Sequence, residues 1–182
     1  MSDPDRAQPP RDAAGRVRLV RLSAAALRAL ADGDLAAANR AVAVPLTPYF
    51  VGPDQRGLWR LRSEQVAADP ASAAWVTNVI WDDERRVAVG HAGYHGPPDA
   101  RGMVEVGYEV DPAYRRRGYA RAALEALLGR AAREPDVRIV RASVGPDNVA
   151  SLRLLSQYGF VEVGEQWDDE DGPETVYEVD AK

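Results

Sequence analysis

The residues from Arg115 to Ala120 have the types and spacing of a phosphate-binding turn. They read Arg-Arg-Arg-Gly-Tyr-Ala, which fits the pattern [Gln/Arg]-x-x-Gly-x-[Gly/Ala]. An amphipathic stretch follows at once, so the turn would open a helix, whose first backbone N–H groups have no partner within the helix. Gly118 leaves no side chain where a phosphate would approach the backbone. Together with the helix dipole and the neighbouring arginines, the turn predicts a site for a pyrophosphate.

A solvated basic turn is the alternative reading of these six residues. Arginine is the habitual basic residue of this chain, since Lys182 is the single lysine among 23 Lys and Arg residues. The context favours the binding site, because the match follows a strand-like stretch and Pro112 and precedes a helix. Other phosphate loops are excluded, since the chain has neither Gly-x-x-x-x-Gly-Lys-[Ser/Thr] nor Gly-x-Gly-x-x-Gly after a strand.

A second pattern lies further along the chain. It reads Asn-x-x-Ser-x-x-Leu-Leu-x-x-x-Gly-Phe from Asn148 to Phe160. Taken alone, it is equally well explained as an amphipathic helix that is capped by Asp147 or Asn148 and stops at Gly159 before a strand. The pattern therefore predicts a helix, and it gains a functional meaning only together with the first turn.

Glu105 is a candidate for acid–base chemistry. It lies on the otherwise apolar stretch from Met103 to Val110, where burying an unpaired carboxylate is costly. Such a carboxylate is either functional or paired with an arginine, and the sequence leaves both possibilities open. Glu109 would share the same strand face if no bulge intervenes, and it is the second candidate.

Apolar periodicity predicts the order of elements that is typical of a mixed sheet. We expect a strand, helices, three strands, a helix, a strand, a helix and two strands, which gives an α+β or α/β fold with helices on both faces. The expected strands are 17–22, 74–81, 86–94, 103–110, 137–144, 160–166 and 175–179. The expected helices are one capped by Ser23 and running through Leu30, one over 34–44, one capped by Asp54 and ended by Pro70, one after Arg117 and ended by Pro135, and one after Asn148.

Composition limits the class of protein. Residues 1–15 are polar and predict a disordered leader, and residues 16–182 predict a single domain whose core the 46% hydrophobic content can fill. No run approaches the ~20 apolar residues of a membrane span, and the leader lacks the apolar core of a secretory signal. The net charge of −5 argues against a nucleic-acid surface. The absence of cysteine excludes disulfides and thiolate chemistry, and we expect a cytoplasmic protein.

The two patterns together resemble those of the GNAT superfamily of N-acetyltransferases. Arg115–Ala120 resembles the family's acetyl-CoA pyrophosphate motif, and Asn148–Phe160 resembles the motif that follows it. The resemblance covers about Arg86 to Gln166, and Val104–Tyr108 is most similar to the ribosomal-protein N-terminal acetyltransferase-like branch. It implies the GNAT fold, a mixed central sheet of six to seven strands that splays open between its fourth and fifth strands.

The resemblance also implies how acetyl-CoA, the co-substrate, would bind. The molecule would wedge between the strands 103–110 and 137–144, with its pantetheine amides paired to the backbone of Tyr108 and Val110. Asn148 would contact the pantetheine arm, and Ser151 would lie close to the cofactor. Next to Arg115, the pyrophosphate would be held by the backbone N–H groups of Arg116, Arg117, Gly118, Tyr119 and Ala120.

The implied reaction is direct attack of a primary amine on the thioester within a ternary complex. The amine must lose a proton, and Glu105 is the first choice for the base, directly or through a water, with Glu109 second. Backbone N–H groups of the central strand would stabilise the charge on the carbonyl oxygen. Many family members place a proton-donating tyrosine where this chain has Leu155. Tyr158 and Ser156 are the substitutes, unless the thiolate leaves without a donor.

Two further features carry expectations about ligands. The acidic turn Trp167–Gly172 is either a solvated loop or a lip that draws a cationic amine to the site, to which Glu165 and Glu174 would add. His91 and His95 alternate on one strand but lack the further ligands of a metal site, so no metal is expected.

These observations predict an acetyl-CoA-dependent N-acetyltransferase whose acceptor is a protein N-terminus or a small amine. A non-catalytic acyl-CoA-binding module is the alternative, because Leu155 replaces the usual tyrosine. A plain interaction domain, in which Arg115–Ala120 binds no cofactor, is a third possibility. The expected partners are acetyl-CoA and an amine, with no nucleic acid and no membrane, and the protein is expected to be a monomer or a homodimer.

Overall fold

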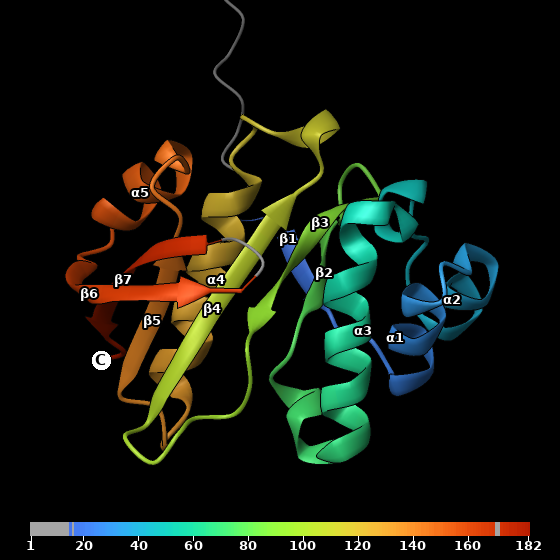
Figure 1. The fold of residues 1–182 in the computed structure, drawn as a ribbon. Helices are drawn as coiled ribbons and strands as arrows, with labels where there is room; N and C mark the ends of the chain where they lie inside the picture. Colours follow the sequence, from blue (N-terminus) through green and yellow to red (C-terminus); the bar gives the residue numbers. More distant parts are fainter. Residues whose placement is uncertain (1–14, 16, 170–171) are drawn as a thin grey trace, which may run out of the picture.

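A seven-stranded sheet forms the middle layer of the part of the chain that the structure describes (Figure 1). The structure is a computed structural model and describes residues 15, 17–169 and 172–182, so the predicted leader lies outside it apart from Gly15. The strands are β1 (Val17–Val20), β2 (Asn78–Asp82), β3 (Val87–Tyr94), β4 (Met103–Val110), β5 (Ile139–Val144), β6 (Val161–Asp168) and β7 (Gly172–Asp180). Their order across the sheet is β1-β2-β3-β4-β5-β7-β6.

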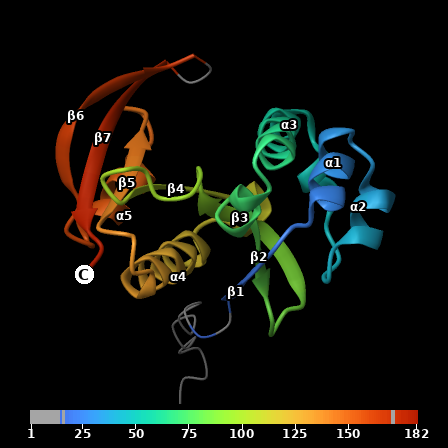
Figure 2. The same cartoon turned by 90° about the horizontal axis from the view of Figure 1, so that it is seen from below.

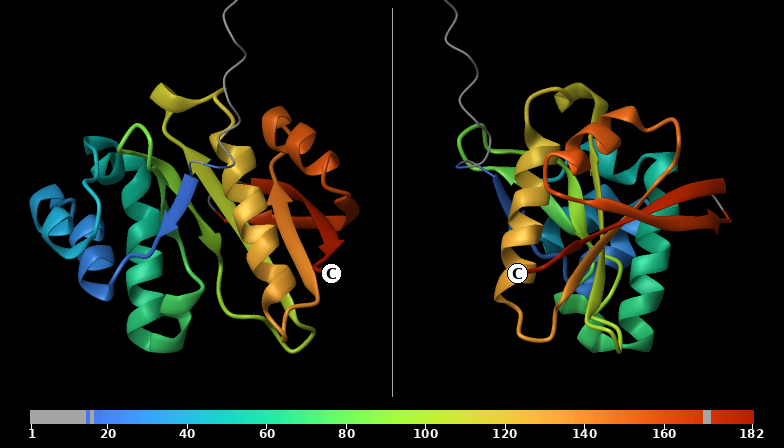
Figure 3. Two further views of the ribbon diagram at one scale, coloured as in Figure 1. Left: turned by 180° about the vertical axis from the view of Figure 1, so that it is seen from behind. Right: turned by 90° about the vertical axis from the view of Figure 1, so that its left-hand side faces the viewer.

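Helices cover both faces of this sheet (Figure 2). The helices are α1 (Ala24–Ala31), α2 (Leu35–Ala41), α3 (Pro53–Ala68), α4 (Tyr119–Arg133) and α5 (Val149–Ser156). One hydrophobic core joins α1, α2 and α3 to β1, β2 and β3, and a second joins α4 and α5 to β4 and β5. Seen from behind, α4 lies across the middle of the sheet (Figure 3). The arrangement confirms the predicted mixed sheet with helices on both faces.

The sheet splays open between β4 and β5. These two strands run parallel, but only Met103–Glu105 pairs with Ile139–Arg141. Beyond this short ladder, β4 continues to pair with β3, and β5 continues to pair with β7. The later residues of β4 and β5 therefore face each other without backbone hydrogen bonds between them. The splay lies between the fourth and fifth strands, where the resemblance placed it.

The predicted elements are present, with corrections at two places. The strand expected over 74–81 begins only at Asn78, because Pro70–Ala74 forms a 3₁₀ helix and Trp75 ends it. Asp54 does not cap α3: Gly52 occupies the N-cap position, and Asp54 lies in the first turn. No helix among the described residues is both long and apolar enough to cross a membrane.

Candidate active site

The Arg115–Ala120 turn forms the N-terminal end of α4, as expected. Gly118 is the N-cap residue and adopts the left-handed region with φ +83°, which a residue with a side chain rarely enters. No side chain caps this helix end. Among the described residues, no hydrogen bond uses the backbone N–H groups from Arg116 to Arg121, whereas Ala122 bonds back to the Gly118 carbonyl. The turn therefore presents a row of backbone donors.

The side chains of Tyr119, which is buried, and of Arg115, which is exposed, tie this turn to neighbouring strands. Tyr119 is 1% exposed, and its hydroxyl donates to Asp82 at 2.6 Å. Arg115 donates from Nε to the Val110 carbonyl at 3.1 Å, which ties the turn to the end of β4. Arg117 points elsewhere, since its guanidinium lies 5.5 Å from the centre of the Tyr114 ring. The backbone, rather than a free arginine cluster, thus defines the turn.

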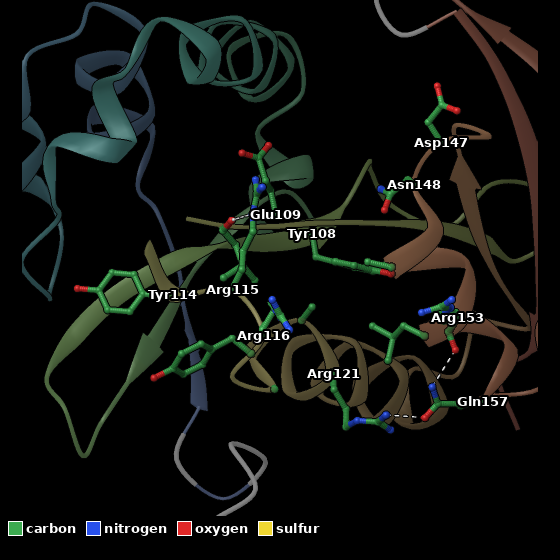
Figure 4. Close-up of a pocket in the computed structure, with 16 residues that line it drawn as sticks. Tyr108, Glu109, Tyr114, Arg115, Arg116, Arg121, Asp147, Asn148, Arg153 and Gln157 are labelled. Carbon is green, nitrogen blue, oxygen red and sulfur yellow. Dashed lines mark hydrogen bonds between the residues drawn. The ribbon is translucent and has the colours of Figure 1, made fainter. Parts of the chain in front are cut away.

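A cavity of about 790 Å³ connects this turn to α5 through the splay (Figure 4). Tyr108 and Glu109 form one end of its lining, and Asn148 borders it from the start of α5. Of the predicted cofactor residues, the structure brings together in this cavity Tyr108, Val110, Arg115, Arg116, Gly118, Tyr119, Ala120 and Asn148. Arg117 and Ser151 do not line it. Burial raises the pKa of Tyr108, and the Ser151 side chain lowers this pKa by a smaller amount.

Asn148 caps α5, which carries one wall of the cavity. Its side-chain oxygen accepts a hydrogen bond from the Ser151 N–H at 3.1 Å. We expect Asn148→Ala to lower the free energy of unfolding by about 1 kcal/mol, because an orphan N–H loses its partner. Urea unfolding would measure this, with Asn148→Ser as the control that keeps a capping oxygen. Equal midpoints for the alanine and serine variants would contradict the role of the cap.

A second cavity, of about 630 Å³, lies on the opposite face of β4. Tyr108 and Glu109 line both cavities, so the two meet at the end of β4. The second cavity is lined by residues of α3 and β3 and by the end of β6 with the turn that follows it. Its charged and imidazole-bearing lining residues are Asp54, Arg62, His91, His95, Glu109, Asp168 and Asp169.

Glu109 is fixed at the junction by neutral donors. One of its oxygens accepts from the Tyr49 hydroxyl at 2.7 Å and from the Gln55 side-chain amide at 2.8 Å. Because the amide nitrogen of Gln55 donates to Glu109, the Gln55 side-chain oxygen faces His91 Nε2 at 2.7 Å. An oxygen can only accept, so His91 Nε2 carries the proton. Burial lowers the pKa of His91 to about 4, which keeps the ring neutral at pH 7. Glu109 therefore presents an anchored carboxylate to both cavities.

Glu105 lines neither cavity but contacts a residue that does. Its side chain accepts a hydrogen bond from the Ser143 hydroxyl at 2.6 Å and lies 3.7 Å from His95 Nδ1. The possibility that it pairs with an arginine is wrong for the described residues: Arg141, opposite it on β5, is paired with Glu178 at 2.6 Å. Glu105 is thus placed to act on the His95 imidazole.

His95 lies over the point where β4 and β5 separate. A Cβ atom on Gly107 would lie 2.9 Å from His95 Nε2, so a side chain at 107 would require the imidazole ring to shift. Gly107 follows closely on Glu105, the last residue of the β4–β5 ladder. The His95 side chain is 47% exposed, so it is only partly shielded from water. This partial burial and, less strongly, Arg62 lower the pKa of His95 below 6.5, while Glu105 and Asp168 raise it. A neutral imidazole at pH 7 can accept a proton.

Residues 16–161 match the family model described as "Acetyltransferase (GNAT) domain". The chain belongs to the GNAT acetyltransferase family. This confirms the resemblance, and the enzyme class of the family supports the expected acyl-CoA-dependent N-acyltransferase.

Named relatives agree with this membership, and a solved structure shares the fold. The chain is 34% identical over 73 residues to the uncharacterized N-acetyltransferase YjdG of Bacillus subtilis, spanning 40% of this chain and 44% of that protein. It is 30% identical over 115 residues to the L-2,4-diaminobutyric acid acetyltransferase of Streptomyces coelicolor, spanning 58% of this chain and 68% of that protein. The ribosomal-protein-S5-alanine acetyltransferase of Vibrio fischeri has the same fold, with a TM-score of 0.60, 18% identity, and coverage of 91% and 92% of the two chains.

The substitutes for the usual GNAT tyrosine do not reach either cavity. Leu155 is 1% exposed and belongs to the core beneath α5. Tyr158 donates its hydroxyl proton to Glu125 and accepts from Arg121 at 3.0 Å, so it is engaged with α4. Ser156 donates to the Arg153 carbonyl at 2.9 Å. We therefore assign no proton transfer to Tyr158 or Ser156, and Tyr108 is the tyrosine that lines both cavities.

Sequence reasoning missed several residues of this GNAT site. Arg121, Arg153 and Gln157 line the first cavity, and the Arg121 guanidinium donates to the Gln157 side-chain oxygen at 2.5 Å. Helical spacing could have placed Arg121 beside the turn. No short sequence pattern indicates that His95 and Arg62 meet in the second cavity, because His95 follows the end of β3 and Arg62 lies on α3.

The acidic turn also lies at the second cavity. Trp167, Asp168 and Asp169 line it, and Trp167 is 73% exposed. Residues 170 and 171 of the predicted lip lie outside the described residues. The described part of the turn therefore adds two carboxylates to the mouth of the cavity.

Proposed function

We propose that this chain transfers the acetyl group of acetyl-CoA to the primary amine of a small molecule. The observation that carries the proposal is that two unlike cavities meet at Tyr108 and Glu109. One ends in a helix N-terminus with free backbone donors, which suits a pyrophosphate. The other is lined by carboxylates and imidazoles, which suit an ammonium group and its deprotonation. The relative from Streptomyces, whose name specifies a diamino acid, supports a small acceptor.

In this proposal, His95 takes the proton and Glu105 assists. A proton on His95 Nδ1 faces Glu105, which leaves Nε2 free to accept a proton from the ammonium form of the acceptor. The neutral amine nitrogen then attacks the thioester carbonyl, the carbon–sulfur bond breaks, and the coenzyme A thiolate leaves. Glu105 stabilises the imidazolium that forms, at a distance of 3.7 Å. Glu109 and the acidic mouth attract the cationic acceptor.

Direct attack in a ternary complex needs no covalent intermediate, which suits a chain without a cysteine to carry the acetyl group as a thioester. Release of free coenzyme A, followed with a thiol reagent, tests the proposal without interference from the protein. The panel contains diamino acids, polyamines and short N-terminal peptides. We expect acceptor-dependent release with small amines and little with peptides. An acetyl-CoA-dependent rise in melting temperature without release from any acceptor would favour the acyl-CoA-binding module instead.

A further inference from the structure

The second cavity contains a buried arginine, Arg62, whose hydrogen-bond acceptors among the described residues are all neutral groups. Arg62 is 6% exposed and lines the cavity from α3. Its Nε donates to the Thr77 hydroxyl at 3.3 Å, and its Nη1 donates to the Gln65 side-chain oxygen at 2.8 Å. Nη1 also donates to the His95 carbonyl at 3.2 Å. These bonds use the N–H groups on Nε and Nη1, and they leave both hydrogens of Nη2 without a partner among the described residues.

Arg62 also lacks the anion that a buried guanidinium normally has. No carboxylate of the described residues lies within 4.0 Å of it, in contrast to Arg141 on β5, which contacts Glu178 at 2.6 Å. Glu105 acts on Arg62 only at longer range, where it raises the pKa that burial lowers. A buried charge without a close counter-ion is costly. A site that keeps such a charge is therefore suited to receive an anion from outside.

The remaining charges of the cavity are of the opposite sign. Glu109, Asp54 and Asp169 line the same space as Arg62. Several carboxylates and one buried guanidinium suit a ligand that carries amino groups and a single carboxylate. A polyamine would leave Arg62 unpaired, and a peptide N-terminus carries an amide where an amino acid carries its carboxylate.

We propose that the acceptor is a free amino acid, most favourably one with a second amino group, and that Arg62 binds its carboxylate through Nη2. The inference rests on the proposed acetyl transfer and names the class of its acceptor. Arg62 already donates to the backbone of His95, so the bound carboxylate lies next to the group that takes the proton. Arg62 thereby sets which amines are oriented for attack.

Matched substrate pairs test this inference. Lysine and cadaverine, ornithine and putrescine, and 2,4-diaminobutyrate and 1,3-diaminopropane differ only by the carboxylate. We expect the protein to acetylate the amino acid of each pair with the higher kcat/KM. Arg62→Met is expected to lower this preference by about 10- to 100-fold, because charge-assisted hydrogen bonds are lost. Arg62→Lys is expected to restore part of it, since it keeps the charge without the fork.

The ratio within a pair is independent of how much of a variant is folded, because both substrates are assayed on one preparation. Arg60→Met is the control, since Arg60 lies on the same helix but is exposed and lines neither cavity. Binding of lysine and cadaverine to the coenzyme A complex, measured by calorimetry, gives the same comparison without turnover.

Two outcomes would overturn the inference while leaving acetyl transfer intact. One is a wild-type protein that acetylates cadaverine, putrescine and 1,3-diaminopropane as efficiently as the amino acids. The other is a preference for the amino acids that survives in Arg62→Met. Absence of coenzyme A release from every member of the three pairs and from N-terminal peptides would contradict the proposed function itself. In that case, equal calorimetric binding of lysine and cadaverine would also overturn the role of Arg62.

Discussion

Replacing His95 with glutamine should lower kcat by about 10²- to 10⁴-fold and leave the affinity for acetyl-CoA unchanged. A general base contributes a rate factor of this order, and the glutamine side chain cannot accept the proton. His95 lines the second cavity but not the first, so the acetyl-CoA site keeps its walls. Steady-state kinetics with the best amine, together with a thermal-shift titration with acetyl-CoA, would measure the two effects separately.

The pH dependence separates a base from a residue that only supports the fold. The ammonium form of the acceptor predominates below the pKa of the amine, so the amine adds no slope to log kcat/KM there. Protonation of His95 gives log kcat/KM a slope of one against pH below the pKa of His95, with a break at that pKa. Burial lowers the pKa of His95, so this break lies below pH 6.5. The charge of Glu105 raises that pKa, so Glu105→Gln is expected to move the break to still lower pH.

Arg62 and Asp168 are the other charged groups that act on the imidazole, one lowering and one raising its pKa. Because neither is altered in Glu105→Gln, the shift reports on the 3.7 Å contact between Glu105 and His95. In His95→Gln the break should vanish. A profile of His95→Gln that keeps the wild-type break at a reduced rate would show that another group takes the proton, and Glu109 would then be the first to examine.

The second large effect is expected at the phosphate turn, where Gly118→Ala should weaken acetyl-CoA binding by about 10- to 100-fold. The residue adopts φ +83°, and a side chain there costs about 1–2 kcal/mol, so the turn is expected to relax away from this conformation. Relaxation misaligns the backbone N–H groups, whose bonds to a charged phosphate contribute about 1.5–3 kcal/mol each. Calorimetric titration with acetyl-CoA would measure the loss.

Gly129→Ala is the matched control, because it makes the same chemical change on the same helix. Gly129 lies inside α4, and the nearest atom to an added Cβ would be the Arg133 guanidinium at 3.5 Å. Its backbone is helical, so alanine is expected to be neutral or slightly stabilising. Unchanged acetyl-CoA affinity in Gly118→Ala, with the Gly129→Ala protein equally tight, would show that the turn does not hold the pyrophosphate.

The parts of the site that could be predicted from sequence are those in which neighbours along the chain make the structure. The Gly118 turn, the boundaries of β4 and the Asn148 cap each depend on a few consecutive residues. The order of the elements followed from periodicity, and the position of the splay followed from the family resemblance. Asp54 was wrongly assigned as a cap because Gly52 and Pro53 already begin the helix.

The remainder of the site depends on contacts between distant parts of the chain. Tyr49 and Gln55, which contact Glu109, lie 60 and 54 residues away from it along the chain, and Arg62 lies 33 residues away from His95. No periodicity indicates such pairs. The choice of Glu105 as a base considered the residue alone, whereas the structure sets His95 between its carboxylate and the cavity. Tyr158 is another example, since its hydroxyl is bonded to α4 residues that are far away in sequence.

The short ladder between β4 and β5 has a consequence for how the protein avoids unwanted association. Strands with free backbone groups usually lie at the border of a sheet, where they invite pairing with a second polypeptide. Here the free groups of β4 beyond Glu105 and of β5 beyond Arg141 lie in the interior of the sheet, each strand being paired on its other side. An extended ligand in the splay could therefore hydrogen-bond with the backbone of both β4 and β5. Neither of these strands is an edge strand that a second protein molecule could extend.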